Sequence, residues 1–337
     1  MLPPLLDRAR GLFHPALYHG RGRRGGYFEG WYYKFVGADG KEAWAVIPGV
    51  FHGPGGKGSH AFIQVLQGAR DASHFHRFPI ESFHAARDRF ELRLGGNHFT
   101  AESLELNIDG GGQRLRGHLQ FSPPTPWPWR PWAPGIMGPF TFTPRLECYH
   151  GVLSLDHPVS GVLEADGTAL DFTGGRGYLE KDWGRSFPRA WVWMQSNHFG
   201  RSGLSLTASI ARIPWMGAAF RGFIVGFLLD GRLHRFATYL GSRTTRLTVG
   251  DERVHWDLEG RGLRLSLEAE RRGGGLLHAP MRSNDVDSAE AMTPRVLESL
   301  TALIHLRLSR IRTGEILFEG TGAHGGLEVG GELSSLL

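Results

Sequence analysis

The sequence predicts an all-β protein made of two small antiparallel β-barrels in tandem, with little helix. Glycine supplies 49 of the 337 residues, about twice the usual share of ~7%, which disfavours long regular helices. Apolar and polar residues alternate along short segments that are separated by turn residues such as Asp39-Gly40. A short motif also occurs twice about 150 residues apart, a length that suits one small antiparallel barrel.

The first barrel is assigned to residues 26–121, after an N-terminal arm of residues 1–25. The arm lacks the basic start and the apolar run of a signal peptide. Six segments of the barrel alternate as strands do. They are 26–36, 43–51, 61–66, 90–94, 103–108 and 115–121.

Residues 122–144 are expected to form a crossover between the barrels. Eight prolines in this segment preclude a central strand. Three tryptophans, Trp127, Trp129 and Trp132, accompany the prolines. Large indole rings are costly to leave in water, so we expect the crossover to cover another part of the protein.

Residues 145–337 are assigned to the second barrel, with terminal strands that could be exchanged with the first. A short helix is expected at 294–300, because Thr293 could cap it and Pro294 suits its first position. The expected strands are 152–155, 177–183, 191–198, 204–213, 220–228, 232–239, 254–258, 263–270, 301–310 and 315–319.

The repeated motif supports the division into two barrels. Gly26-Tyr27-Phe28-Glu29 is followed by Trp31, and Gly177-Tyr178-Leu179-Glu180 is followed by Trp183. A second aromatic segment follows each copy. We interpret the copies as equivalent strands of two duplicated units, with a chance match in a glycine-rich chain as the alternative.

Charge and motif content exclude several classes of function. The net charge is +5, but the arginines are scattered singly and no nucleic-acid-binding module is recognisable, so no nucleic-acid partner is expected. The chain lacks phosphate-binding and serine-hydrolase motifs, and no cofactor is expected. Cys148, His150 and His157 match no common zinc spacing, so no metal is expected. A single cysteine favours the cytoplasm, with peripheral membrane contact at most.

Alternation along 177–184 places Tyr178, Glu180 and Asp182 on one face of a strand, and Lys181 and Trp183 on the other. Two carboxylates would then lie within about 7 Å along the strand. On a buried face, one carboxyl group would have a raised pKa and could act as an acid. On a solvated face the pair would be inert.

The following strand carries Trp191, Trp193, Gln195 and Asn197 on one face. Two indoles and two carboxamides are typical of a ligand pocket, and hydrogen bonding to a nearby loop is the alternative. In the first motif, Glu29 lies on a face with aromatic side chains. It is either a second polar anchor or the partner of a basic residue, and we favour the ion pair.

Several blocks of the chain resemble the tocopherol cyclase family. They are Glu180-Lys181-Asp182-Trp183-Gly184 with Phe187-Pro188-Arg189, Tyr27-Phe28-Glu29-Gly30-Trp31-Tyr32, His60-Ala61-Phe62-Ile63-Gln64-Val65-Leu66 and Leu327-Glu328-Val329-Gly330-Gly331. The resemblance implies a lipocalin-like fold, as a tandem pair of barrels akin to the carotenoid hydratases. It also implies chroman-ring closure on a prenylated quinol. Plant members carry Asn in place of Asp182, so Glu180 is the better candidate for an essential acid.

Our hypothesis is that Glu180, or otherwise Asp182, donates a proton to an alkene. The cation formed would be stabilised by aromatic ring faces and captured by a phenolic oxygen in a dry pocket. The expected substrate-binding residues are Trp31, Glu29, Tyr32, Lys181, Trp183, Trp191, Trp193, Gln195 and Asn197. The expected partner is a hydrophobic isoprenoid. Hydration of an isoprenoid or carotenoid double bond, and non-catalytic transport of a hydrophobic ligand, are the alternatives.

Overall fold

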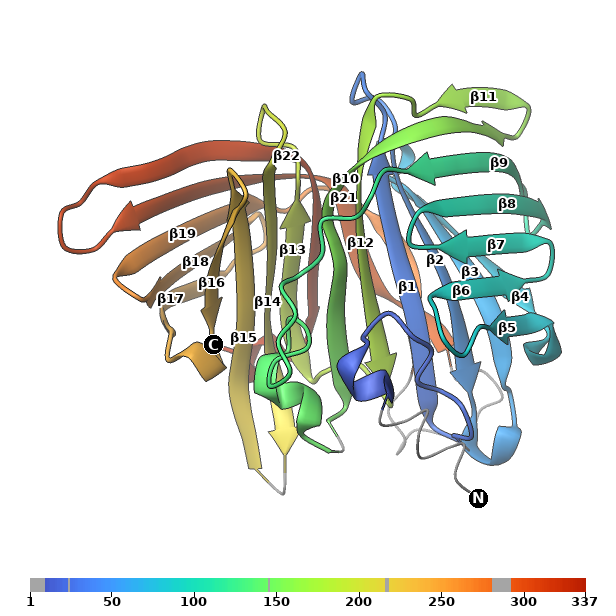
Figure 1. Ribbon diagram of the computed structural model, residues 1–337, viewed down its shortest axis with the longest axis horizontal. Helices are drawn as coiled ribbons and strands as arrows, with labels where there is room; N and C mark the ends of the chain where they lie inside the picture. The colour runs from blue at the N-terminus through green and yellow to red at the C-terminus, as the bar shows by residue number, and fades with distance from the viewer. Residues whose placement is uncertain (1–9, 24, 145, 216–217, 281–291) are drawn as a thin grey trace. The chain divides into compact units, whose positions relative to one another are not determined.

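The computed structural model describes residues 10–23, 25–144, 146–215, 218–280 and 292–337 (Figure 1). The described residues fall into two units. Unit 1 holds 10–67, 72–187, 276–280 and 292–295, and unit 2 holds the remainder. Within this described part, no helix is long and apolar enough to span a membrane. The predicted all-β class with two units is confirmed, because two large antiparallel sheets account for most of the chain.

The first sheet has twelve strands in the order β4-β3-β2-β1-β12-β10-β9-β8-β7-β6-β5, and β11 pairs with β10. Their bounds are β1 Tyr27–Val36, β2 Ala43–His52, β3 His60–Gln67, β4 Ala72–Phe78, β5 Phe83–Ala85, β6 Glu91–Leu94, β7 Asn97–Thr100, β8 Ser103–Gly110, β9 Gln113–Phe121, β10 Cys148–Ala165, β11 Thr168–Asp171 and β12 Gly175–Gly184.

The second sheet has ten strands in the order β16-β15-β14-β13-β22-β21-β19-β18-β17, and β20 pairs with β21. Their bounds are β13 Ala190–Ser196, β14 Leu204–Trp215, β15 Ala218–Leu229, β16 Arg232–Ala237, β17 Arg243–Val249, β18 Arg253–Gly260, β19 Leu263–Glu270, β20 Gly275–Pro280, β21 Met292–Arg310 and β22 Ile316–Gly331. The short 3-10 helices are η1 Pro54–Gly56, η2 Gly68–Arg70, η3 Ile80–Ser82, η4 Gly138–Phe142, η5 Thr238–Leu240 and η7 Leu333–Ser335.

Both sheets follow one plan. The first strand of each, β1 or β13, lies between the second strand and the last strand, β12 or β22. The edge strands of sheet 1, β4 and β5, are consecutive in the chain and joined by η3, and those of sheet 2 are joined in the same way by η5. Among the described residues, hydrogen bonding does not close either sheet, so each is an open sheet and not the closed barrel that the sequence suggested.

The two copies of the repeated motif lie in the same sheet. Strands β1 and β12 are antiparallel neighbours (Figure 1). Glu29 lies opposite Trp183, and Tyr32 lies opposite Glu180. The interpretation of the copies as equivalent strands of two units was therefore wrong. The structural counterpart of β1 in the second sheet is β13, which lacks the motif.

The chain passes from the first sheet to the second at a different point from the boundary expected at residue 145. Strands β10 to β12 belong to sheet 1, and the division between the units falls between Phe187 and Pro188. The expected helix at 294–300 was also wrong, because these residues lie in β21. There Glu298 and Ser299 pair with β22, and the cross-strand pairing overrides the local capping signals. Pro294 is tolerated near the beginning of the strand.

Burial differs between the two halves of sheet 1. Strand β8 alternates, with Leu104, Leu106 and Ile108 buried and the residues between them exposed or half-buried. Strands β1, β2, β3 and β12 are instead buried on both faces along most of their length. Polar side chains on these strands are therefore withdrawn from water on either face.

The crossover only partly matches the expectation from its tryptophans. Trp127 is buried, whereas Trp129 is 48% exposed and Trp132 is 67% exposed. The prolines keep the segment out of the sheets, and a two-residue bridge between Arg130 and Ala133 forms a tight turn that holds Trp132 outward. The expectation that all three indoles are covered was wrong.

Candidate functional site

Strand β12 carries ionisable side chains on both of its faces. We call the face with Leu179 the core face, because Leu179 packs in the main apolar cluster of unit 1 together with Trp31 of β1. Lys181 and Trp183 alternate with Glu180 and therefore share the core face, while Tyr178, Glu180 and Asp182 lie on the opposite face, called here the far face. This is the alternation that the sequence predicts.

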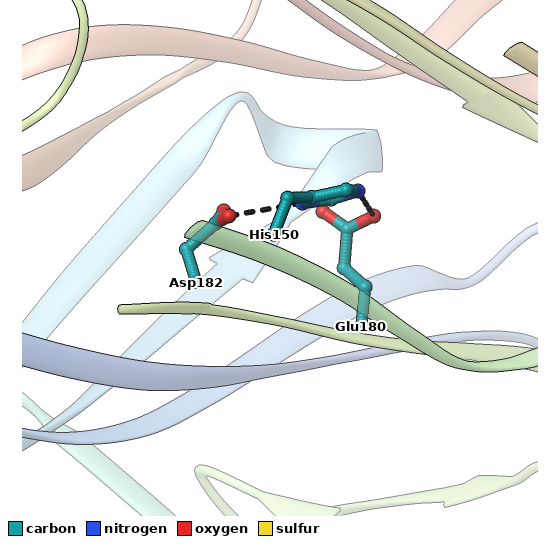
Figure 2. A group of neighbouring side chains, drawn as sticks. All are labelled: His150, Glu180 and Asp182. Atoms are coloured by element: carbon teal, nitrogen blue, oxygen red, sulfur yellow. Dashed lines mark hydrogen bonds and ion pairs between the residues drawn. The ribbon is translucent and has the colours of Figure 1, made fainter. Parts of the chain in front are cut away.

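On the far face, the imidazole of His150 lies between two carboxylates (Figure 2). Its Nδ1 is 2.9 Å from Oδ1 of Asp182, the residue opposite it across the β10–β12 pair. Its Nε2 is 3.5 Å from Oε2 of Glu180. The hydroxyl of Tyr178 donates a hydrogen bond to the same Oε2. The side chain of Glu180 is 5% exposed and that of Asp182 is 30% exposed, so the cluster extends from a buried carboxyl to the surface.

This arrangement suits proton transfer. An ionised carboxylate at Asp182 can only accept a hydrogen bond, so it requires the proton of a neutral imidazole to be on Nδ1. The proton acceptor of the ring is then Nε2, which lies 3.5 Å from Oε2 of Glu180. Protons can then pass between Nε2 and the Glu180 carboxyl group. The predicted alternative in which Glu180 and Asp182 lie on a solvated, inert face does not fit the burial of Glu180.

The same three residues could hold a metal ion, since one ligand atom from each lies within 4.8 Å of the others. The geometry fits a proton relay better. The two carboxylates contact different nitrogens of the imidazole, and only one of these nitrogens can bind a given ion. Binding one ion through all three residues requires the contact between Asp182 and Nδ1, or that between Glu180 and Nε2, to be broken.

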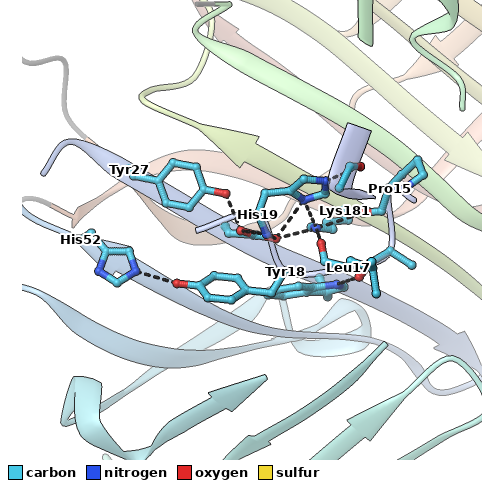
Figure 3. Close-up of polar contacts among 11 residues, drawn as sticks. Pro15, Leu17, Tyr18, His19, Tyr27, His52 and Lys181 are labelled. Carbon is cyan, nitrogen blue, oxygen red and sulfur yellow. Dashed lines mark hydrogen bonds and ion pairs between the residues drawn. The ribbon is translucent and has the colours of Figure 1, made fainter. Parts of the chain in front are cut away.

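On the core face, Lys181 is fully buried and forms an ion pair with Glu29 of β1, at 2.5 Å between Nζ and Oε1. The ammonium nitrogen also lies within hydrogen-bonding distance of the carbonyl oxygens of Pro15 and Leu17, at 3.0 and 2.5 Å, and of Nδ1 of His19, at 2.7 Å (Figure 3). It lies 4.6 Å from the ring centroid of Trp31. The ion pair predicted for Glu29 is present.

Glu29 is equally well satisfied. It accepts the backbone N–H of His19 and the hydroxyl of Tyr27. Burial alone would raise the pKa of Glu29, but Lys181 and His19 lower it to about 2. Burial lowers the pKa of Lys181 to about 8 against the opposing effect of Glu29. Both groups are therefore charged at neutral pH, and together they anchor the N-terminal arm to the sheet.

A cavity of about 310 Å³ opens beside this anchor. One wall is aromatic, because the Trp183 ring stacks on His19 at 4.4 Å between centroids and on Tyr149 at 5.7 Å. Arg21 and Arg23 also line the cavity. Trp183 therefore contributes to this cavity on the core face and is separated by the strand from Glu180.

The structure thus divides the expected site residues into three groups. Glu180 and Asp182 lie together on the far face with Tyr32, which is opposite Glu180 on β1. The core face holds Trp31, Glu29, Lys181 and Trp183. Unit 2 holds Trp191, Trp193, Gln195 and Asn197, all of them buried. On β13 the first three alternate with Val192 and Met194, which lie in the apolar cluster of that unit. Their roles stay predictions.

The sequence did not identify His150, Tyr178 or His19 as members of a site. His150 was considered only as a metal ligand, on the basis of its spacing from Cys148. The pairing of β10 with β12, which brings His150 opposite Asp182, joins segments about 30 residues apart and leaves no local signal. The Tyr-x-Glu spacing was visible in both motifs, and in a strand this spacing places both side chains on one face.

Comparison with known proteins agrees with these observations. A family model described as tocopherol cyclase-like matches residues 130–331, which include His150, Glu180 and Asp182. The chain is 28% identical over 202 residues to a probable chloroplastic tocopherol cyclase of Oryza sativa subsp. japonica, covering 56% of this chain and 40% of that protein. The chain therefore spans about two-fifths of the length of this relative.

Solved structures share the fold. The crystal structure of CghA with Sch210972 matches with a TM-score of 0.56 at 12% identity and covers 91% of this chain and 89% of that chain. Kievitone hydratase from Nectria haematococca matches with a TM-score of 0.52 at 10% identity and covers 94% of each chain. Because the family model matches more than half of the sequence, this chain belongs to the tocopherol cyclase-like family.

Proposed function

We propose that the protein is an enzyme that protonates an isoprenoid double bond and closes a chroman ring on a prenylated quinol. Membership of the tocopherol cyclase-like family supports a reaction of the cyclase or hydratase type. The observation that carries the proposal is the imidazole of His150 between Glu180 and Asp182, since it supplies an acid and a base in one cluster.

In the proposed reaction, a protonated Glu180 gives its proton to an alkene carbon and leaves a tertiary cation on the neighbouring carbon. The phenolic oxygen of the quinol bonds to that cation, and the phenolic proton passes to Nε2 of His150. The imidazolium, stabilised by Asp182 at Nδ1, then returns a proton to Glu180 across the 3.5 Å contact. No atoms are gained or lost, so the product is an isomer of the substrate.

The roles of the two carboxylates differ in this scheme. Glu180 is buried and would touch the reacting carbon, so the scheme assigns it the role of catalytic acid. Asp182 acts through His150 and is a positioning residue. An asparagine at this position, as the resemblance to plant members implies, could accept from Nδ1–H through its carbonyl oxygen and keep the imidazole in place. This explains how the position tolerates an amide while Glu180 remains an acid.

Hydration is the second candidate. The 30% exposure of the Asp182 side chain gives water a route to the cluster, and water could capture the cation in place of the phenolic oxygen. A hydrated product is heavier than its substrate by one water molecule, whereas a cyclised product has the same mass. A carrier, the third alternative, would release its ligand unchanged.

The test is an assay of the purified protein with prenylated quinols, with products separated by chromatography and identified by mass. We expect an isomeric product, and we expect Glu180→Gln to lower turnover by about 10²–10⁴-fold without a change in circular dichroism. Glu105→Gln, which changes an exposed carboxylate on β8, is the matched control and should keep full turnover. Normal turnover by Glu180→Gln would exclude Glu180 as the acid.

A further inference from the structure

Unit 1 exposes a group of large apolar side chains that the proposed reaction does not use. We call it the apolar patch, and it consists of Leu12, Phe13, Trp129, Trp132 and Phe142. The rings of Phe13 and Phe142 lie 5.6 Å apart, and Nε1 of Trp129 donates to the carbonyl oxygen of Phe13 at 2.9 Å. The arm, the crossover and η4 therefore contribute to one contiguous surface.

Such exposure requires an explanation. Soluble proteins rarely expose large contiguous apolar patches unless the patch binds a partner or a membrane. Trp129 and Trp132 are the most exposed of the patch residues, although an indole is among the costliest side chains to leave in water. The hydrogen bond from Trp129 and the Arg130–Ala133 turn fix both indoles in place, so their exposure is built into the fold.

Four arginines lie at or beside the patch. Arg10 precedes Leu12 by two residues, and Arg130 follows Trp129 directly. Arg21 and Arg23 line the same cavity as Leu12 and Phe142. Within the part of the chain that the structure describes, none of these four arginines has a carboxylate within 4.0 Å. Exposed tryptophans beside arginines that have no carboxylate partner are the composition that favours the interface of an anionic membrane.

We propose that the apolar patch docks on the surface of an anionic lipid bilayer. Trp129, Trp132 and Phe13 enter the interface between headgroups and acyl chains, while the arginines contact the lipid phosphates. The cavity behind Leu12 and Phe142, with its aromatic wall at Trp183, then opens towards the bilayer. The proposal rests on exposure and charge alone and holds whether or not the protein is a cyclase.

The test is flotation of the purified protein with vesicles of phosphatidylcholine alone and of phosphatidylcholine mixed with phosphatidylglycerol. We expect binding to the anionic vesicles, weaker binding to the neutral ones, and a loss of the difference at high salt. Trp129→Ser with Trp132→Ser should weaken binding at least about tenfold. Arg21→Gln with Arg23→Gln should weaken binding to anionic vesicles by about fivefold for each charge removed.

The matched control is Ile311→Ser with Ile316→Ser, which removes two comparably exposed apolar side chains at the β21–β22 turn. This control should bind vesicles like the wild-type protein. Equal loss of binding in the control, or no binding of the wild-type protein to either vesicle, would overturn the proposal. A dimer in solution that the tryptophan variant converts to a monomer would also overturn it, because the patch would then be a surface for self-association.

Discussion

Two glutamates on adjacent strands share one local motif and have different surroundings. Glu29 and Glu180 each follow a tyrosine by two residues, and each accepts the hydroxyl of that tyrosine. Glu29 lies on the core face, where Lys181 neutralises it. Glu180 lies on the far face, where the imidazole of His150 is beside it.

The glycines that begin the two motifs are required for different reasons. Gly26 has a φ of +59°, a left-handed conformation that other residues adopt only with strain. Gly177 lies within β12, where a Cβ atom would be 2.3 Å from Nε2 of His157. The similarity of the motifs therefore reflects the needs of two paired strands and not one repeated environment.

The different partners of Glu29 and Glu180 indicate which buried carboxylate is available for chemistry. A lysine partner fixes the charge of Glu29 over the whole physiological range, and so this pair holds the arm in place. An imidazole partner can accept a proton and return it, and so the charge of the Glu180 cluster can change during a reaction. The following predictions test this contrast between a structural and a chemical carboxylate.

The largest effect is expected for Lys181→Met. Removing one partner of a buried ion pair leaves the other charge uncompensated, so the free energy of unfolding should fall by about 3–5 kcal/mol. Urea denaturation measures this loss. Adding Glu29→Gln to the variant should restore part of it, because the uncompensated charge is then removed.

Two further variants complete this comparison. Lys41→Met changes an exposed lysine and should leave the midpoint of unfolding unchanged. Glu180→Gln should change the free energy of unfolding by less than about 1 kcal/mol, although we expect it to lower turnover by about 10²–10⁴-fold. A loss of stability in Glu180→Gln as large as in Lys181→Met would show that both glutamates are structural.

Acid should weaken the core-face anchor. The pKa of Glu29 is about 2 in the folded protein, below the ordinary value of 4.5. A lowered pKa contributes stability that is complete above pH 4.5 and is lost as the pH falls towards 2. This difference in pKa corresponds to about 3 kcal/mol. The stability of the wild-type protein should therefore fall more steeply than that of Glu29→Gln over this range, and parallel curves would contradict the prediction.

Local patterns in the sequence were enough to predict much of this contrast. Alternation placed Tyr178, Glu180 and Asp182 on one face of their strand, and three aromatic neighbours suggested an ion pair for Glu29. Strand order was not predictable in the same way. One of the two neighbours of β1 is β12, about 150 residues away, and no local pattern encodes that pairing. For the same reason, no local pattern predicted that His19 in the arm contacts Lys181.

Substitution of Asp182 tests its role as a positioning residue. Asp182→Asn keeps an acceptor for Nδ1–H of His150, and we expect kcat to stay within about threefold of the wild-type value. Asp182→Ala removes the acceptor and should lower kcat by about 10–100-fold with KM little changed. The measurement is steady-state turnover of the prenylated quinol. Equal losses in the two variants would assign a direct acidic role to Asp182.

The smallest effects are expected for the two tyrosines that bond the glutamates. Tyr27→Phe removes a hydrogen bond to the permanently charged Glu29 and should lower the free energy of unfolding by about 2 kcal/mol, without altering turnover. Tyr33→Phe, which removes a bond to the neutral carbonyl of Thr100, is the control and should cost about 1 kcal/mol. Urea denaturation measures both losses in stability.

Tyr178→Phe should reduce turnover more than stability, the reverse of what we expect for Tyr27→Phe. A carboxyl group that exchanges protons during turnover spends part of the cycle neutral, and a neutral partner makes its bond to Tyr178 weaker than the bond of Tyr27 to Glu29. We therefore expect a loss of about 1 kcal/mol in stability or less, together with a severalfold drop in kcat. A loss of stability equal to that of Tyr27→Phe, with normal kcat, would mean that Glu180 stays ionised like Glu29 and does not donate the proton.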